Sequence, residues 1–197
     1  MDDAVTATTI QTWSGGPFDL LKPRAEDINL LDIAQSLGKL NRFNGHSKFA
    51  YSVAQHSILV SMLLAETEYE REGLMHDAAE AYVGDIATPL KRALRSRLSP
   101  FEKDPLQEIC EPIERLIADK FGLVYPWPIE VHNADREALR IERQYVMHPS
   151  SGVSWVGVGV SDRHCRIPPV DPETATAQFL ETYQTLTLRV IPSGEKH

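Results

Sequence analysis

Hydrophobic side chains recur every three or four positions along most of the chain, which is the period of an amphipathic α-helix. In residues 27–38, Asp27 is a candidate N-cap and the apolar positions continue to Gly38. The same period predicts further helices over residues 51–65, 70–83, 105–121, 129–147 and 171–188, with a short one beginning at Pro89. Pro112 can kink the helix that contains it. The pattern therefore predicts an all-α protein.

Two segments depart from this period. Residues 1–24 contain β-prone residues around a Gly15-Gly16 turn, which predicts an irregular or β-hairpin lead-in packed on the rest of the chain. Within residues 150–169 the stretch VSWVGVGV alternates in hydrophobicity, which predicts loop with a short strand. No repeat, low-complexity tract or linker divides the chain. We therefore expect one helical-bundle domain over residues 25–190, preceded by the lead-in.

The composition is that of a soluble globular protein: 197 residues, 42 % hydrophobic and 24 % charged. The net charge of −8 argues against binding a nucleic-acid polymer, but local cations can still attract a small anionic substrate. Cys110 and Cys165 have no paired spacing, so reduced thiols are expected. The N-terminus does not resemble a signal peptide, and no apolar run is long enough to span a bilayer. A cytoplasmic protein without membrane contact is expected.

Two histidines lie on apolar faces of predicted helices. His56 shares a face with Val53 and Val60, and His76 precedes Asp77 at the end of the apolar stretch GLM. A single inward histidine is more often a core residue bonded to a carbonyl, and acidic helix residues usually face solvent. Two inward histidines beside an aspartate change this balance, because coordinating a cation is the least costly way to bury them together.

A further ligand is expected from the helix over residues 129–147. Asp135 shares the apolar face of Val131 and Ala138, and an aspartate on such a face requires a partner. His132 is the competing ligand, but its position fits a neighbouring or surface residue better.

The ordered set His56, His76-Asp77 and Asp135 resembles the H…HD…D motif of the HD-domain superfamily of metal-dependent phosphohydrolases. The segments LNRF, YSVAQHS, MHDAAEAYVGDIATPLK and NADREAL are together similar to its YfbR-like branch, which includes bacterial 5′-nucleotidases and phage deoxynucleoside triphosphohydrolases. The likeness covers roughly residues 28–145. It implies an HD-domain helical bundle that hydrolyses a phosphate ester or anhydride of (deoxy)nucleoside mono- or triphosphates. It also implies that a homodimer can form, since members of this branch commonly dimerise.

One divalent metal ion is therefore predicted, with four ligands: His56, His76, Asp77 and Asp135. Two imidazoles and two carboxylates suit Mn²⁺, Co²⁺, Fe²⁺, Ni²⁺ or Zn²⁺ better than Mg²⁺. Such an ion lowers the pKa of bound water. Glu80, one turn after His76, is placed to orient or deprotonate that water, and its alternative is a solvent-facing helix carboxylate.

Phosphate binding requires positive charge near the metal. In the branch that the chain resembles, Arg42, Asp85 and Lys91 match positions around the scissile phosphate. A guanidinium can grip two phosphate oxygens, whereas Asp85 suits a general acid or a partner of a sugar hydroxyl. Lys91 can equally be a surface cation and Asp85 a loop carboxylate. His46 and Lys48, farther along the loop of Arg42, are expected to meet additional phosphates, which favours di- or triphosphate substrates.

Phe43, His46 and Trp13 are candidates for a pocket wall or for base stacking, with core packing the competing role for Phe43. Two other functions fit the same residues: a non-catalytic nucleotide sensor or scaffold that retains the metal, and an HD hydrolase of another phosphorylated signalling nucleotide. Glu80 and Arg42 together argue against a scaffold, which needs neither. The sequence favours a nucleotide-hydrolysing enzyme.

Overall fold

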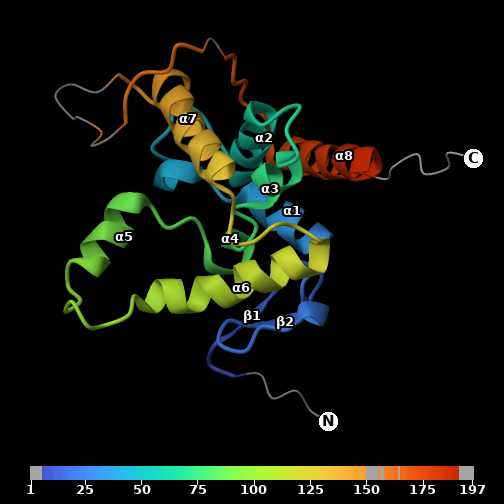
Figure 1. The fold of residues 1–197 in the computed structure, drawn as a ribbon, viewed down its shortest axis with the longest axis vertical. Helices are drawn as coiled ribbons and strands as arrows, with labels where there is room; N and C mark the ends of the chain where they lie inside the picture. The colour runs from blue at the N-terminus through green and yellow to red at the C-terminus, as the bar shows by residue number, and fades with distance from the viewer. Residues whose placement is uncertain (1–5, 150–154, 156–157, 164, 191–197) are drawn as a thin grey trace, which may run out of the picture.

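Helices make up most of the structure, a computed structural model that describes residues 6–149, 155, 158–163 and 165–190 (Figure 1). In chain order the elements are β1 (Thr9–Gln11), β2 (Pro17–Asp19), the 3-10 helix η1 (Ala25–Asp27), α1 (Leu30–Lys39), the 3-10 helix η2 (Arg42–Gly45), α2 (Val53–Leu63), α3 (Glu70–Met75), α4 (Glu80–Val83), α5 (Thr88–Arg95), α6 (Pro105–Phe121), α7 (Ile129–Tyr145) and α8 (Pro172–Val190). The prediction of an all-α protein with a small N-terminal hairpin is confirmed. Within the described ranges, no helix is both long and apolar enough to cross a membrane.

The N-terminal lead-in is a β-hairpin. Strands β1 and β2 pair antiparallel, with Ile10 opposite Phe18, and Gly15 in the turn between them has a φ of +89°. A positive φ is readily adopted by glycine, which explains the Gly15-Gly16 turn. Phe18 is fully buried and stacks on Tyr82 of α4, with ring centroids 3.9 Å apart. The hairpin is therefore anchored to the helices through its second strand.

Helix α2 is the centre of the bundle. It packs against α3, α7 and α8, and seven of its 11 residues are buried. The helix begins at a capping box, in which Ser52 and Gln55 each bond the other's backbone N–H. Helix α1 packs on α8 at Gly38, where an added Cβ would stand 2.2 Å from Thr176 Oγ1. Glycine at this position therefore permits the close approach of the two helices.

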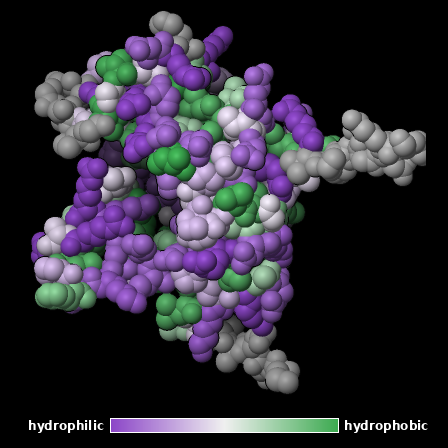
Figure 2. Space-filling view, viewed as in Figure 1, coloured by the Kyte–Doolittle hydropathy of each residue, from purple (hydrophilic) through white to green (hydrophobic). Residues whose placement is uncertain are grey.

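Helix α5 and the start of α6 extend away from this bundle (Figure 1). Helix α5 has no buried residue, and its Leu90 and Leu94 side chains are about half exposed. The same face of the molecule is hollowed between α5 and α7 (Figure 2). The arm formed by α5 and the start of α6, called the α5 arm below, thus forms one side of a recess.

Two predicted element boundaries are wrong. Asp27 does not cap α1, because it lies in η1 and its carboxylate bonds the Arg24 guanidinium at 2.7 Å. Asn29 is the cap, since its side chain accepts the backbone N–H of Asp32 at 2.8 Å. The predicted helix over residues 70–83 is divided into α3 and α4 by a turn at residues 76–79.

The remaining helices agree with the prediction. Helix α6 spans the predicted 105–121, and α8 follows Asp171, whose carboxylate accepts the Thr174 backbone N–H at 2.7 Å. The strand predicted within residues 150–169 falls partly outside the described residues, and residues 155, 158–163 and 165–169 form no strand. Cys110 and Cys165 are free thiols, as predicted.

Candidate metal centre

Two imidazoles and a carboxylate converge where α2 faces the turn between α3 and α4. Nε2 of His56 and Nε2 of His76 each lie 3.3 Å from Oδ2 of Asp77. The three donor atoms that these residues offer lie within 4.8 Å of one another. Donors at adjacent corners around one ion, each about 2.1 Å from it, lie about 3 Å apart. The group His56, His76 and Asp77 can therefore hold a metal ion.

Hydrogen bonds at the far side of each ring fix the orientation of both imidazoles. Nδ1 of His76 donates to the Gly73 carbonyl at 2.8 Å, and Nδ1 of His56 lies 2.6 Å from Oε1 of Glu142. Because both partners are acceptors, each Nδ1 carries the hydrogen and each Nε2 of a neutral ring presents a lone pair. Neither Nε2 has a hydrogen-bond partner among the described residues. Histidines that bind a metal through Nε2 have this arrangement, in which Nδ1 is hydrogen-bonded and Nε2 is not.

Asp135 of α7 stands at the edge of this group. Its Oδ1 lies 3.2 Å from Nε2 of His56 and 4.0 Å from Nε2 of His76. Its side chain is 41 % exposed, whereas that of His56 is fully buried. Asp135 therefore stands beside the group of three, on the side that opens to solvent, and its role as a fourth ligand stays a prediction. The competing ligand His132 is exposed, as the sequence indicated.

The break between α3 and α4 shapes the turn that carries His76 and Asp77. Backbone bonds here join residues three apart, from the Ala78 N–H to Met75 and from the Glu80 N–H to Asp77. The turn is therefore wound more tightly than an α-helix. One turn earlier, an added Cβ at Gly73 would lie 2.6 Å from a Leu64 methyl group and 3.2 Å from Ser61 Cα. Gly73 thus allows α3 to approach the residues at the end of α2, which brings the two histidines together.

Sequence reasoning missed Glu142, which is fully buried beneath the centre. Its carboxylate accepts bonds from the Tyr51 hydroxyl at 3.0 Å, from Nδ1 of His56 and from the Arg42 guanidinium at 3.3 Å. Burial raises the pKa of Glu142, but Arg42 and His56 outweigh burial and hold this pKa below its usual value. The available signal was spacing: Glu142 is seven residues after Asp135 and four after Ala138, on the same face of α7.

Arg42 lies between two carboxylates of the site. The antiparallel bridge between Asn41 and Ser52 places Arg42 at the start of α2. Its side chain is 12 % exposed, and its terminal nitrogens lie 3.5 Å from Asp77 and 3.3 Å from Glu142. Burial disfavours its charge, yet the two carboxylates raise its pKa above the usual value. Arg42 therefore supports the centre directly; its role in holding phosphate stays a prediction.

Negative charge dominates the field around the histidines. Burial favours the neutral rings, and Arg42 adds to this effect at His56. The nearby carboxylates outweigh burial and raise the pKa of both rings. Among these carboxylates, the largest contribution comes from Glu142 at His56 and from Asp77 at His76. The centre therefore attracts positive charge, whether from protons or from a metal ion.

Glu80 and Lys91 line a cavity of about 70 Å³ beside the centre, together with His76, Asp77, Ala79, Val83, Gly84, Ile86, Leu106, Cys110 and Glu114. Oε2 of Glu80 is buried without a hydrogen-bond partner in the described part of the chain, so Glu80 is not a solvent-facing carboxylate. Burial, with Asp77 and Asp85 nearby, raises the pKa of Glu80 to about 9. Burial also raises the pKa of Asp85, although the positive charges of Arg42 and Lys91 reduce this rise. These residues can exchange protons beside the centre; their catalytic roles stay predictions.

The remaining predicted residues lie in other surroundings. Lys48 bonds the Tyr145 carbonyl at 3.3 Å, at the C-terminal end of α7, and His46 is exposed. Contact of these two with phosphate stays a prediction. Phe43 packs near Trp155, with centroids 5.7 Å apart, and Trp13 lines a different pocket.

Two relatives match much of the chain. The uncharacterized protein YfdR of Escherichia coli is 35 % identical over 181 residues, which are 90 % of this chain and 95 % of YfdR. An uncharacterized protein of Rhodobacter capsulatus is 34 % identical over 145 residues, which are 68 % of this chain and 70 % of that protein. No protein-family model matches the chain. The resemblance to HD-domain proteins therefore stays a prediction.

Proposed function

The chain belongs to the family of Escherichia coli YfdR, and we propose that it is an HD-type phosphohydrolase that uses one divalent metal ion to hydrolyse nucleotides. The observation that carries this proposal is the pair of buried imidazoles whose unpaired Nε2 atoms face one carboxylate oxygen. When the rings are neutral, acceptor atoms face each other at these distances and repel, and either a proton or a metal ion between them removes this repulsion. Their nitrogen and oxygen donors suit Mn²⁺, Co²⁺, Fe²⁺, Ni²⁺ or Zn²⁺.

His56, His76, Asp77 and Asp135 would hold the ion in this proposal. A divalent ion there supplies Lewis acidity toward water and a phosphoryl oxygen. Glu142 and the Gly73 carbonyl keep the two rings oriented, because each occupies the opposite ring nitrogen.

Glu80 is the proposed general base. Its Oε2 is buried and unpaired within the described residues, so it is free to accept the proton of the attacking water. The raised pKa of Glu80 reflects burial and two neighbouring carboxylates, and a cation beside Asp77 opposes this effect. Asp85 is the proposed donor of a proton to the leaving oxygen, since burial raises its pKa as well.

Lys91 and Arg42 are the proposed phosphate contacts. Lys91 lines the same cavity as Asp77 and Glu80, which supports this role. Arg42 is paired with Asp77 and Glu142, its Nε is buried without a partner among the described residues, and its proposed phosphate contact rests on its position beside Asp77. The nucleotide as substrate rests on the resemblance to the YfbR-like branch.

The test is product release from a panel of ribo- and deoxynucleoside mono-, di- and triphosphates with Mn²⁺ or Co²⁺ added. Release of phosphate, pyrophosphate or triphosphate identifies both the substrate and the bond that breaks. Asp77→Ala serves as the inactive control, and Asp119→Ala, an exposed aspartate of α6, as the matched active control. A protein that binds about one equivalent of metal and releases no product from any nucleotide would be a metal-retaining sensor instead.

A further inference from the structure

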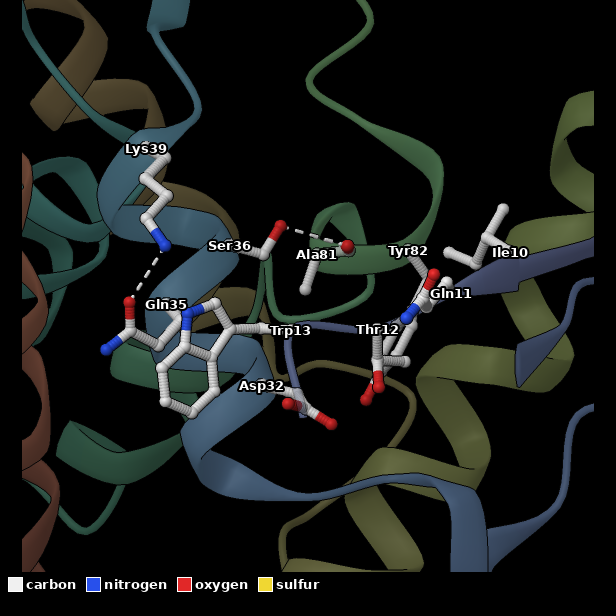
Figure 3. Close-up of a pocket in the computed structure, with 10 residues that line it drawn as sticks. All are labelled: Ile10, Gln11, Thr12, Trp13, Asp32, Gln35, Ser36, Lys39, Ala81 and Tyr82. Atoms are coloured by element: carbon white, nitrogen blue, oxygen red, sulfur yellow. Dashed lines mark hydrogen bonds between the residues drawn. The ribbon is translucent and has the colours of Figure 1, made fainter. Parts of the chain in front are cut away.

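A second cavity, of about 200 Å³, lies between the N-terminal hairpin and α1 (Figure 3). Its lining comes from three elements far apart in sequence: Ile10, Gln11, Thr12 and Trp13 of the hairpin; Asp32, Gln35, Ser36 and Lys39 of α1; and Ala81 and Tyr82 of α4. The four α1 residues recur at helical spacing, so one polar stripe of α1 faces the cavity. None of them belongs to the metal centre.

Trp13 offers an open aromatic surface at this cavity. Its side chain is 55 % exposed, although tryptophan is highly buried in most proteins. Lys39 stands over the ring, with its Nζ 5.8 Å from the ring centroid. Figure 3 shows Trp13 beside Gln35, which accepts a hydrogen bond from Lys39 Nζ at 2.9 Å. The aromatic face and the cation are therefore held side by side.

The accessible charge of the cavity is positive. Asp32 is buried, and its carboxylate already accepts bonds from the Ser14 backbone and hydroxyl and from the Asn29 amide. Lys39 is exposed, so its ammonium is the charge that a ligand meets. Amide and hydroxyl groups of Gln11, Thr12 and Gln35 add donors and acceptors around the aromatic face.

We propose that this cavity is a second binding site, for planar heteroaromatic anions of the nucleoside monophosphate class. The base stacks on Trp13, the nearby amides bond its edge, and the phosphate meets Lys39. The volume supports this placement, because about 200 Å³ is below the usual range of pockets that enclose a whole ligand, roughly 300–1,000 Å³. The base fits inside while the sugar and the phosphate remain at the mouth.

The site shares one helix with the metal centre, so an experiment must separate the two. Ala81 and Tyr82 directly follow Glu80 in α4, and the Ser36 hydroxyl donates to the Ala81 carbonyl at 3.0 Å. Binding at the second site does not depend on hydrolysis at the metal centre. The measurement is therefore made with a chelator present and repeated in the Asp77→Ala protein.

The probe is adenosine 5′-monophosphate, titrated into metal-free protein by calorimetry, with adenosine and inorganic phosphate as partial probes. Trp13→Ala should weaken binding of the nucleotide about tenfold or more, the range of a lost base–aromatic stack. Lys39→Gln should weaken binding of the nucleotide about three- to tenfold and leave binding of adenosine unchanged, because only the phosphate contacts the ammonium. Asp77→Ala should bind the nucleotide as the unaltered protein does.

The matched controls are Phe101→Ala, an aromatic residue 97 % exposed on the α5 arm, and Lys103→Gln nearby. Both should bind the nucleotide as the unaltered protein does. The proposal is overturned if the nucleotide shows no saturable binding, if Trp13→Ala and Phe101→Ala behave alike, or if binding disappears in Asp77→Ala. Product release with Mn²⁺ tests the metal centre alone, so failure of one proposal leaves the other standing.

Discussion

The metal centre and the α5 arm present charged groups in opposite ways. At the centre, His56 of α2 and Glu142 of α7 are fully buried and bond each other, and Glu142 also accepts from the Tyr51 hydroxyl. On the arm, α5 has no buried residue, and Lys91 reaches the cavity from a helix that little else contacts. Buried polar groups with several hydrogen-bond partners are held in one geometry. Exposed charged groups can change their partners at little cost in free energy. The centre should therefore determine whether metal binds, and the arm should adjust how tightly substrate binds.

The largest effect is expected from Asp77→Ala. Asp77 faces both Nε2 atoms and Arg42, so its loss removes one of the two proposed oxygen ligands and leaves His56, His76 and Arg42 without their shared partner. Metal content should fall from about one equivalent to near zero, and turnover should disappear with it. Elemental analysis and product release measure the two quantities, with Asp119→Ala as control. Full metal content in Asp77→Ala would show that the ion lies elsewhere.

Glu80→Gln should separate chemistry from metal binding. The substitution keeps the shape of the side chain but removes the base, so turnover should fall about 10²–10⁴-fold while metal content is retained. Glu130→Gln, an exposed glutamate of α7, is the matched control. Equal loss of metal in Glu80→Gln and Asp77→Ala would make Glu80 a ligand and contradict its assignment as a base.

Glu142→Gln tests the support beneath the centre. An amide oxygen can still accept from Nδ1 of His56, but the charge that pairs with Arg42 is lost. Metal affinity should fall about 10–100-fold, the usual effect of removing the partner of a ligating histidine. Titration calorimetry with Mn²⁺ measures this change.

Tyr51→Phe is the comparison for Glu142→Gln, because it removes a single hydroxyl donor to the same carboxylate. It should lower the free energy of unfolding by about 0.5–1.5 kcal/mol and change metal affinity much less. Similar loss of metal affinity in both variants would mean that general destabilisation, and not the orientation of His56, accounts for the effect.

The smallest effect is expected on the arm. Lys91→Ala should raise KM a few-fold through one lost charge-assisted contact, about 1 kcal/mol at a partly buried position, with metal content unchanged. Arg92→Ala, an exposed neighbour on α5, should leave KM unchanged. A loss of metal in Lys91→Ala would remove the distinction between the centre and the arm.

Much of the fold could be predicted because it depends on local patterns. Helical spacing predicted α2, α6, α7 and α8, and the Gly15-Gly16 pair predicted the hairpin. The same spacing assigns His56 and Asp135 to the inward faces of their helices. One error, the N-cap of α1, arose because two nearby residues both had the side chain of a good cap. Asp27 and Asn29 are both good caps, but Asp27 lies in η1 and pairs with Arg24, while Asn29 directly precedes α1 and caps it.

By itself, the sequence determined the helices and the side of each helix that carries histidine or carboxylate, because these follow from periods of a few residues. Tertiary structure decided which of these groups meet. The Arg42 and Glu142 pair joins residues 100 positions apart, and Gly73 lets α3 approach the end of α2 just before the turn that carries His76 and Asp77. Trp13 lines a cavity with Lys39 and Tyr82 because Phe18 stacks on α4 and Ser14 bonds Asp32 of α1. Such contacts arise from packing and charge pairing between distant segments, and a local pattern contains no information about which distant partner will be buried beside it.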